Sequence, residues 1–303
     1  MFNSFFSNQM IGLYDLSINP PSTNFLEFLI YLEISRQLKK RNNFEVIIYD
    51  NLKFLKKEKK FDNEKMFSYK RRCFDICINS LQLFDKIEKF TLLTGRFKKK
   101  FNSNLIYYDV SIHQKFMFDE YNKLSNPIFN FDKSSYAVFS NWCSQNQIDP
   151  SRVVTLTVRN INFDKRRNFD LEQIYRIYDF LINKNFFPII IDDIEGSTKN
   201  NNNKSYLFCD LASSSCLNKF IFYSNAKLNI FSGNIPQYIC QFGELNYIFI
   251  RKEPQNTFLT KDVLNKSLKF KLFNKEKIFR KIIYNENYFS EIKKSIEEFI
   301  NIF

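Results

Sequence analysis

Apolar and polar positions along the first fifty residues predict a strand, a helix and a second strand. The first apolar stretch runs from Ile11 to Leu16 and is followed by a Pro-rich break. Apolar side chains then recur at helical spacing from about Asn24 to Lys40, with Ser22 or Thr23 in position to cap the helix. Phe44–Asp50 is a largely apolar run typical of a buried strand. This β–α–β order makes the loop before the helix a natural place for a ligand.

The rest of the first half carries weaker patterns. Phe67–Ile87 and Ser134–Gln147 are predicted to be helical. Two short strands are predicted at Phe90–Leu93 and Leu105–Tyr108. The lysine-rich segment Lys53–Lys60 is expected to be exposed.

The second half repeats the alternation of strands and helices. Its predicted strands are Val153–Val158, Phe187–Ile191, Leu228–Phe231 and Tyr247–Ile250, the last strand of the chain. Its predicted helices are Leu171–Asn183, Asn218–Phe222, Pro236–Phe242 and Glu286–Phe303. Glu195–Ser205 is a polar, Asn-rich loop. The order predicts an α/β protein with a parallel sheet in each half.

The boundary between the halves is predicted at Asp149 and Pro150, because proline restricts the conformation of the residue before it. We therefore expect an N-terminal lobe over residues 1–148 and a C-terminal lobe over 149–285. Residues 286–303 are expected to form a terminal helix.

The composition limits the kinds of partner that fit. Of the 303 residues, 37 are Phe and only 5 are Gly, and the formal net charge is +13. An abundance of Phe, Lys, Ile and Asn is typical of AT-rich coding, so part of the positive charge carries no functional information. The remainder would favour polyanions, an anionic membrane surface or phosphorylated substrates.

Several classes of protein are excluded by missing motifs. No apolar run approaches the ~20 residues of a membrane-spanning helix, and the first residues lack a signal-peptide pattern. The 6 cysteines contain no CxxC pair, which favours free thiols in a cytoplasmic protein. A single histidine, His113, excludes a histidine-cluster metal site, and neither a P-loop nor a GxGxxG motif occurs.

The clearest candidate for ligand binding is the end of the predicted strand at Val158. Arg159 and Asn160 follow this strand directly, and Arg167 lies in the same loop. Ligands of open α/β sheets bind at the carboxyl ends of the strands, and the guanidinium fork suits phosphate or carboxylate. The competing interpretation is an ordinary surface arginine in a basic protein.

A second candidate is the turn after the strand Leu228–Phe231. Ser232 and Gly233 lead into a helix that Pro236 would open, and the N–H groups at such a helix start suit a phosphate. A plain connection between strand and helix explains the same residues equally well.

Acidic residues provide weaker candidates. Asp192, Asp193 and Glu195 follow a strand and could contact a ribose, a sugar or a metal, although such residues are usually solvated turn formers. In the first half, Asp15, Ser22 and Thr23 lie at the first strand-to-helix loop, where a base or an acceptor-contacting residue could come from, although helix capping by Ser22 or Thr23 is the preferred interpretation of those two residues.

Two passages resemble a group of bacterial proteins from surface-polysaccharide gene clusters that is similar to glycosyltransferases of the GT-B type. One is Tyr14–Leu29; the other comprises Arg152–Arg159, then Arg167-Asn168, then Pro188–Asp193. The resemblance implies an α/β fold with two Rossmann-like lobes that contain parallel sheets and face a cleft. It implies that residues 286–303 cross back to the N-terminal lobe.

The resemblance also implies where the substrates bind. The C-terminal lobe would bind a nucleotide-sugar and the N-terminal lobe the acceptor. Arg159 would contact the nucleotide diphosphate with help from Ser232 and Gly233, and Asn160, Arg167 and Asp193 are further candidates for this site. Such enzymes generally work without a bound metal, so we expect neither a metal nor a resident cofactor.

The function predicted from these observations is transfer of a sugar from a nucleotide-sugar to a glycan or lipid-linked acceptor, with Asp15 as the base. The basic surface would suit peripheral contact with an anionic inner membrane. A non-catalytic nucleotide- or glycan-binding partner protein is the alternative, since Asn24 stands where the group prefers Asp. Nucleic-acid binding ranks last, because the lysines are spread along the chain.

Overall fold

The computed structural model describes residues 10–19, 21–50, 70, 73–94, 105–129, 134–159, 170–192, 206–251, 261–284 and 288–303. Spatial proximity of the backbone divides the chain into two compact units, Met1–Ile128 and Phe129–Phe303. Each unit contains a parallel sheet of its own.

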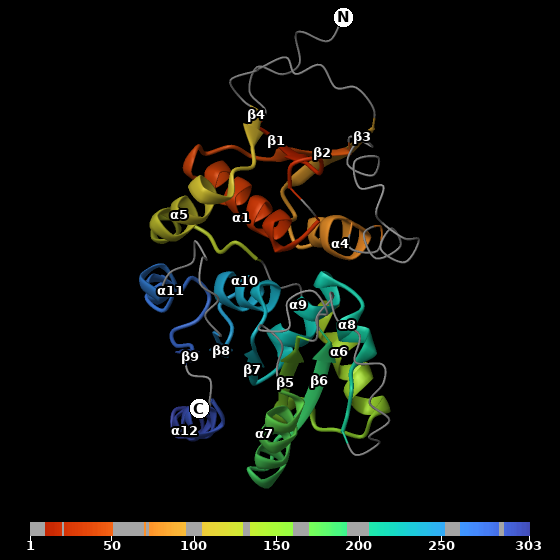
Figure 1. Cartoon of the computed structure of the whole chain (residues 1–303), viewed down its shortest axis with the longest axis vertical. Helices are drawn as coiled ribbons and strands as arrows, with labels where there is room; N and C mark the ends of the chain where they lie inside the picture. Colours follow the sequence, from red (N-terminus) through yellow and green to blue (C-terminus); the bar gives the residue numbers. More distant parts are fainter. Residues whose placement is uncertain are drawn as a thin grey trace, which may run out of the picture. The chain divides into compact units, whose positions relative to one another are not determined.

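The first unit is built on a 4-stranded parallel sheet (Figure 1). In the order β3-β2-β1-β4, the strands are Ile87–Thr94, Phe44–Asp50, Met10–Asp15 and Leu105–Tyr107. Strand β1 lies between two neighbours, and its last residue, Asp15, pairs with Tyr49 of β2. Every residue of β1 is buried, which explains why its sequence up to Tyr14 has no alternation of apolar and polar side chains.

The helix α1 (Thr23–Leu38) is the main cover of this sheet and packs against α5 (Val110–Glu120). The Ser22 hydroxyl accepts a hydrogen bond from the Asn24 N–H at 3.3 Å, so Ser22 is the helix cap. Other described helical segments are the π-helix Cys73–Ile78, α4 (Asn79–Leu81) and the 3-10 turn Tyr121–Lys123.

Gly12 allows α1 to lie close to the sheet. A Cβ atom added to Gly12 would lie 2.3 Å from Leu32 Cδ1 and 2.7 Å from Phe28 Cζ, both on α1. Both side chains are fully buried. The helix therefore occupies the space that the missing side chain leaves, at the density of a protein interior.

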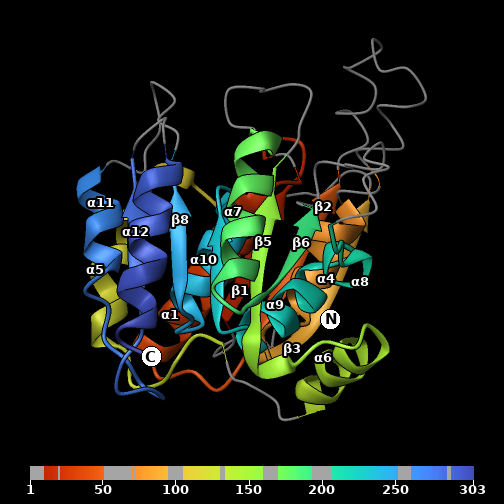
Figure 2. The ribbon, with the colours of Figure 1, turned by 90° about the horizontal axis from the view of Figure 1, so that it is seen from below.

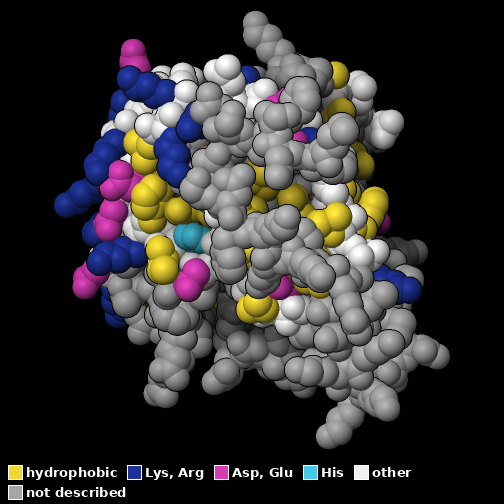
Figure 3. Space-filling model, turned by 90° about the horizontal axis from the view of Figure 1, so that it is seen from above, with side chains coloured by type: hydrophobic (Ala, Val, Ile, Leu, Met, Phe, Trp, Pro, Cys, Tyr) yellow, Lys and Arg dark blue, Asp and Glu magenta, His cyan; other side chains and the backbone are white. Residues whose placement is uncertain are grey.

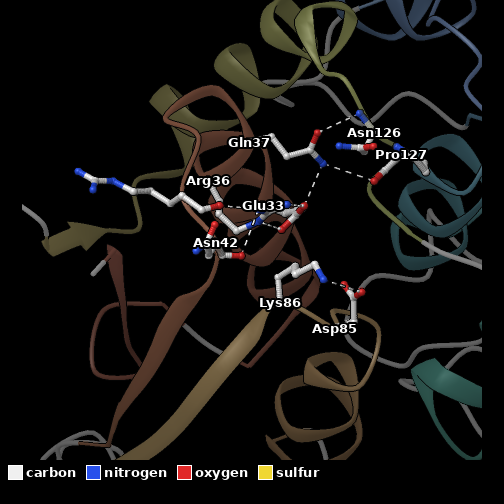
Figure 4. Close-up of polar contacts among 9 residues, drawn as sticks. Glu33, Arg36, Gln37, Asn42, Asp85, Lys86, Asn126 and Pro127 are labelled. Carbon is white, nitrogen blue, oxygen red and sulfur yellow. Dashed lines mark hydrogen bonds and ion pairs between the residues drawn. The ribbon is translucent and has the colours of Figure 1, made fainter. Parts of the chain in front are cut away.

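The end of the first unit is attached to α1 by polar contacts (Figure 4). The Gln37 amide donates to the Pro127 carbonyl at 3.4 Å and accepts from the Asn126 N–H at 3.2 Å. Gln37 also donates to Glu33 at 2.9 Å, and Arg36 donates to both oxygens of that carboxylate at 2.7 and 2.8 Å. Because Glu33 is buried, the paired guanidinium offsets part of its desolvation. The backbone before the unit boundary is thus fixed to the helix.

The second unit is built on a 5-stranded parallel sheet. In the order β6-β5-β7-β8-β9, the strands are Phe187–Asp192, Val153–Val158, Leu228–Phe231, Tyr247–Ile250 and Arg280–Ile283. All residues of β5, β7 and β8 are buried, as expected when helices cover both faces of a parallel sheet.

Helices lie on both faces of this second sheet (Figure 2). On one face, α7 (Leu171–Asn183) and α12 (Phe289–Ile300) pack on each other and share a core with Leu156 and Ile230 of the strands. On the other face α9 (Cys216–Asn225) bonds to β5 through Tyr223 and contacts three helices. These three are α6 (Ser134–Gln145), α8 (Asp210–Ser213) and α10 (Asn234–Phe242). The helix α11 is Lys261–Ser267.

The helix α6 packs within the second unit. The rings of Phe139 and Trp142 lie edge-on to Phe222 of α9, with centroids 5.5 and 5.3 Å away. The compact units meet after Ile128, and the lobe bounds expected from the sequence, 1–148 and 149–285, stay a prediction. Contact of residues 286–303 with the N-terminal lobe stays a prediction; α12 packs on α7 and β9.

The predicted α/β class with two parallel sheets is confirmed. The prediction that Tyr247–Ile250 is the last strand is wrong, since β9 pairs beside it. Strand β9 begins with Arg280 and Lys281 and has no apolar run to reveal it. Two predicted segments, Lys53–Lys60 and Glu195–Ser205, lie outside the described residues.

We expect Gly12→Ala to lower the free energy of unfolding by about 1–3 kcal/mol, because the added methyl group overpacks the contact with α1. Urea unfolding followed by circular dichroism measures the change. The substitution should cost less in a Leu32→Ala background, where the 2.3 Å contact is gone. Equal costs in both backgrounds would show that Gly12 does not set the distance between helix and sheet.

Candidate functional site

The carboxyl ends of the second sheet's strands bring polar residues to one edge. Thr157 of β5 pairs with Phe231 of β7, and Phe231 pairs with Phe249 of β8. Thr157, Phe231 and Phe249 therefore form a row of paired residues across the three strands. Two residues further along each strand's chain are Arg159, Gly233 and Arg251. Because paired residues of parallel strands stay level, these three residues come to the same edge.

Arg159 is buried there, with 5% of its surface exposed. Side chains alternate between the faces of a strand, so Arg159 is expected on the face of Thr157. The Thr157 hydroxyl lies 2.6 Å from the Tyr223 hydroxyl, which places this face on the side of α9. A guanidinium stays protonated and offers five donors, so this position suits an anionic ligand.

The helix α9 adds a buried cation to the same edge. Lys219 lies one helical turn before Tyr223 and is 0% exposed. Its Nζ donates to the carbonyl oxygen of Asp192 at 2.6 Å, and Asp192 ends β6, the neighbour of β5. The ammonium group is thus held beside the end of β6.

The turn after β7 leads directly into α10. Gly233 is the N-cap of this helix and provides no side-chain acceptor for the first N–H groups. The Ser232 hydroxyl oxygen is buried and has no hydrogen-bond partner within the described part of the chain. The predicted helix start at Pro236 is wrong, since α10 begins at Asn234. Proline is tolerated there because first-turn N–H groups need no intrahelical acceptor.

In the first unit, Asp15 ends β1 at the carboxyl edge of the sheet and is 6% exposed. Its Oδ1 accepts hydrogen bonds from the Ser17 N–H at 2.9 Å and the Ser17 hydroxyl at 2.5 Å. Among the described residues, both of these hydrogen bonds go to the same carboxylate oxygen. Burial raises the pKa of Tyr107 on the neighbouring strand β4, and the charge of Asp15 adds to this increase.

Glu27 of α1, the helix that follows β1 in the sequence, is part of a buried polar cluster. The Tyr108 hydroxyl donates to its carboxylate at 2.7 Å, and the Gln114 amide donates at 2.9 Å. All three side chains are buried. The cluster joins α1 to α5, which the sequence patterns did not predict.

His113 of α5 is held in its neutral form. Its Nδ1 accepts a hydrogen bond from the Asp109 N–H at 3.0 Å, and its ring stacks on Tyr31 with centroids 3.8 Å apart. Burial lowers the pKa of His113 to about 4, while the charge of Asp109 acts in the opposite direction. The proton of the neutral ring is therefore on Nε2.

Two thiols of the second unit, those of Cys143 and Cys209, do not fit a nucleophilic role. Burial raises the pKa of Cys143 to about 11 and that of Cys209 to about 12, so the reactive thiolate is disfavoured. No group of three or more His, Cys, Asp or Glu side chains within the described segments could hold a metal ion. No helix in those segments is long and apolar enough to cross a bilayer.

Two solved structures share this fold over nearly their whole length. The glycosyl transferase family 9 protein from Veillonella parvula DSM 2008 matches with a TM-score of 0.51 and 10% identity, covering 97% of this chain and 98% of its own. The E. coli ADP-heptose LPS heptosyltransferase II matches with a TM-score of 0.50 and 11% identity, covering 97% and 99%. The chain has the GT-B fold. No protein-family model and no curated protein matches the sequence.

On the GT-B fold, the structure brings some of the predicted site residues together. Arg159, Ser232 and Gly233 lie at the carboxyl edge of the second sheet, and Asp15 lies at that of the first. The other predicted residues, Asn160, Arg167 and Asp193, lie outside the described residues and stay predictions.

Two buried cations of the GT-B second unit were missed by the sequence interpretation. Arg251 follows β8 as Arg159 follows β5, and it is 6% exposed. The rule that selected Arg159 would have found Arg251. Lys219 lies inside a helix and has no local signal, because its neighbourhood depends on how α9 packs.

We expect the ring of His113 to titrate near pH 4 in the folded protein rather than at 6.5. The unfolded state then binds a proton between these values that the folded state does not, so stability falls as the pH falls through this range. Proton NMR can follow this single histidine, and His113→Gln should remove this part of the pH dependence. Titration near 6.5 in the folded protein would contradict the assignment.

Proposed function

We propose that the protein is a glycosyltransferase that moves a sugar from a nucleotide-sugar to a glycan or lipid-linked acceptor. The observation that carries the proposal is the buried guanidinium of Arg159 at a strand end that is level with the uncapped start of α10. Both groups favour an anion, and the fold is one that glycosyltransferases use.

On the donor side, the second unit would hold the diphosphate of the nucleotide-sugar. Arg159 would donate to the phosphate oxygens, and Ser232 and the backbone of Gly233 would add donors at the start of α10. Negative charge grows on the diphosphate as the bond to the sugar breaks, and preorganised donors stabilise this charge in the transition state. Asn160, Arg167 and Asp193 are proposed to contact the rest of the donor.

On the acceptor side, we assign the role of general base to Asp15. Ser17 holds one carboxylate oxygen, and the other is available to accept the proton of the attacking hydroxyl group. A carboxylate fixed at a strand end has little freedom to move. The proposed reaction uses the chain's own donors and needs no resident cofactor.

The location and the acceptor follow from the same proposal. The two similar structures are named as a glycosyl transferase and an LPS heptosyltransferase. By analogy we propose a cytoplasmic protein that acts on a surface-glycan precursor, with peripheral contact to an anionic inner membrane. In the face seen in Figure 3, lysine and arginine side chains are mixed with acidic ones.

The second candidate function is nucleotide or glycan binding without catalysis. Asn24, at the start of α1, cannot act as the acid or base that an Asp could provide. Binding of a nucleotide-sugar without release of nucleotide or transfer of sugar would favour this candidate.

We expect Arg159→Gln to weaken nucleoside diphosphate binding about 10- to 100-fold, as for the loss of a charged hydrogen bond. Isothermal titration calorimetry with UDP, GDP and ADP measures this loss. Arg152→Gln is the matched control, because Arg152 precedes β5 at the opposite edge of the sheet. An unchanged affinity in Arg159→Gln would remove the proposed donor site.

We expect Asp15→Asn to lower turnover of the nucleotide-sugar about 10²- to 10⁴-fold while nucleotide affinity stays unchanged, because a general base acts only in the chemical step. Release of nucleoside diphosphate measures turnover. Ser17→Ala should show a smaller loss, since it removes one of the two hydrogen bonds to Asp15. Full turnover in Asp15→Asn would assign the base to another residue.

A further inference from the structure

We infer that Arg251 is a second cation of the donor site and makes the site selective for a diphosphate over a monophosphate. The inference rests on the proposed function and deepens it, because it names the residue that contacts the second phosphate group of the donor. Arg251 was not among the residues that the sequence patterns selected.

The register of the sheet relates Arg251 to Arg159. Both residues are two positions beyond the level row formed by Thr157, Phe231 and Phe249. The backbone N–H of Arg251 donates to the Ile283 carbonyl at 2.8 Å, so the ladder between β8 and β9 still fixes the backbone at this position. The same alternation that places Arg159 on the side of α9 places Arg251 on that side.

The Gly233 turn lies between the two arginines. Strand β7 separates β5 from β8, and neighbouring strands lie about 4.8 Å apart, so the two backbones are about 10 Å apart. The long side chains can therefore approach the start of α10 from both sides. Each guanidinium offers a fork of donors that fits one phosphate group.

Positive charge is concentrated at this edge of the second sheet. Arg159 is 5% and Arg251 6% exposed, and each lies just beyond the end of a strand of the same sheet. A third buried cation, Lys219, is held at the end of β6 on the other side of β5. Cations therefore lie at the ends of three strands, β6, β5 and β8. A ligand with two phosphate groups matches this distribution better than a ligand with one.

The alternative is that Arg251 only stabilises the fold. A structural arginine would affect every nucleotide equally, or none of them. An arginine that contacts the second phosphate group would change the affinity of the diphosphate alone. The ratio of the two affinities therefore separates the alternatives.

Isothermal titration calorimetry with three nucleotide pairs, UDP and UMP, GDP and GMP, and ADP and AMP, tests the inference. The unaltered protein should bind one diphosphate at least about tenfold more tightly than its monophosphate. In Arg251→Gln the diphosphate affinity should fall about tenfold or more, while the monophosphate affinity stays within about twofold. Arg251→Lys keeps the charge but loses the fork, so its loss should be smaller.

Arg152→Gln is again the matched control and should leave both affinities unchanged. Thermal unfolding of each variant checks the fold, and Arg251→Lys replaces Arg251→Gln if the latter does not fold. An unchanged ratio in a folded Arg251 variant would overturn the inference and leave the proposed function intact. Failure of the unaltered protein to bind any of the six nucleotides would overturn the proposed function and this inference with it.

Discussion

Parallel pairing is the constraint on which the rest of this structure depends. Every strand pair in the described sheets is parallel, so all strands of a sheet end at the same edge. Helices must then cover both faces, which is why the central strands are apolar throughout. The carboxyl ends of the strands are one place where charged groups enter such a core. Asp15, Arg159 and Arg251 all lie at the carboxyl ends of strands. Their positions follow from the common direction of the strands more than from the local sequence.

Polar side chains inside the second sheet connect this edge to its helices. The Thr155 hydroxyl donates to the Asn229 side chain at 2.7 Å, and Asn229 donates to the Tyr223 carbonyl at 3.0 Å. One row further, Thr157 reaches the Tyr223 hydroxyl. These bonds fix how α9 lies on the sheet and therefore where Lys219 points its ammonium group. The two threonines interrupt an otherwise apolar strand, and their hydroxyl groups form these hydrogen bonds. A buried hydroxyl group without a hydrogen-bond partner would be unfavourable.

The sequence allowed most strands to be predicted, because a buried parallel strand is a short apolar run between polar breaks. Strand β9 lacks such a run and helix α5 lacks a regular apolar stripe, so both were missed. Arg159 could be found because it follows a clear strand, and Arg251 satisfies the same rule. Lys219 could not, since the partner of its ammonium group is a carbonyl 27 residues away. Such contacts depend on how segments far apart in the sequence pack together, and this packing cannot be predicted from local sequence patterns.

The contact between Gln37 and the end of the first unit has a consequence for how this chain can vary. At the end of the unit, the amide binds two backbone groups, the N–H of Asn126 and the carbonyl of Pro127. Side chains at these two positions can therefore drift during evolution without moving the point where the chain leaves the unit. One replacement is forbidden: a proline at position 126 has no N–H to donate. The attachment thus tolerates many sequences and is sensitive to a single kind of change.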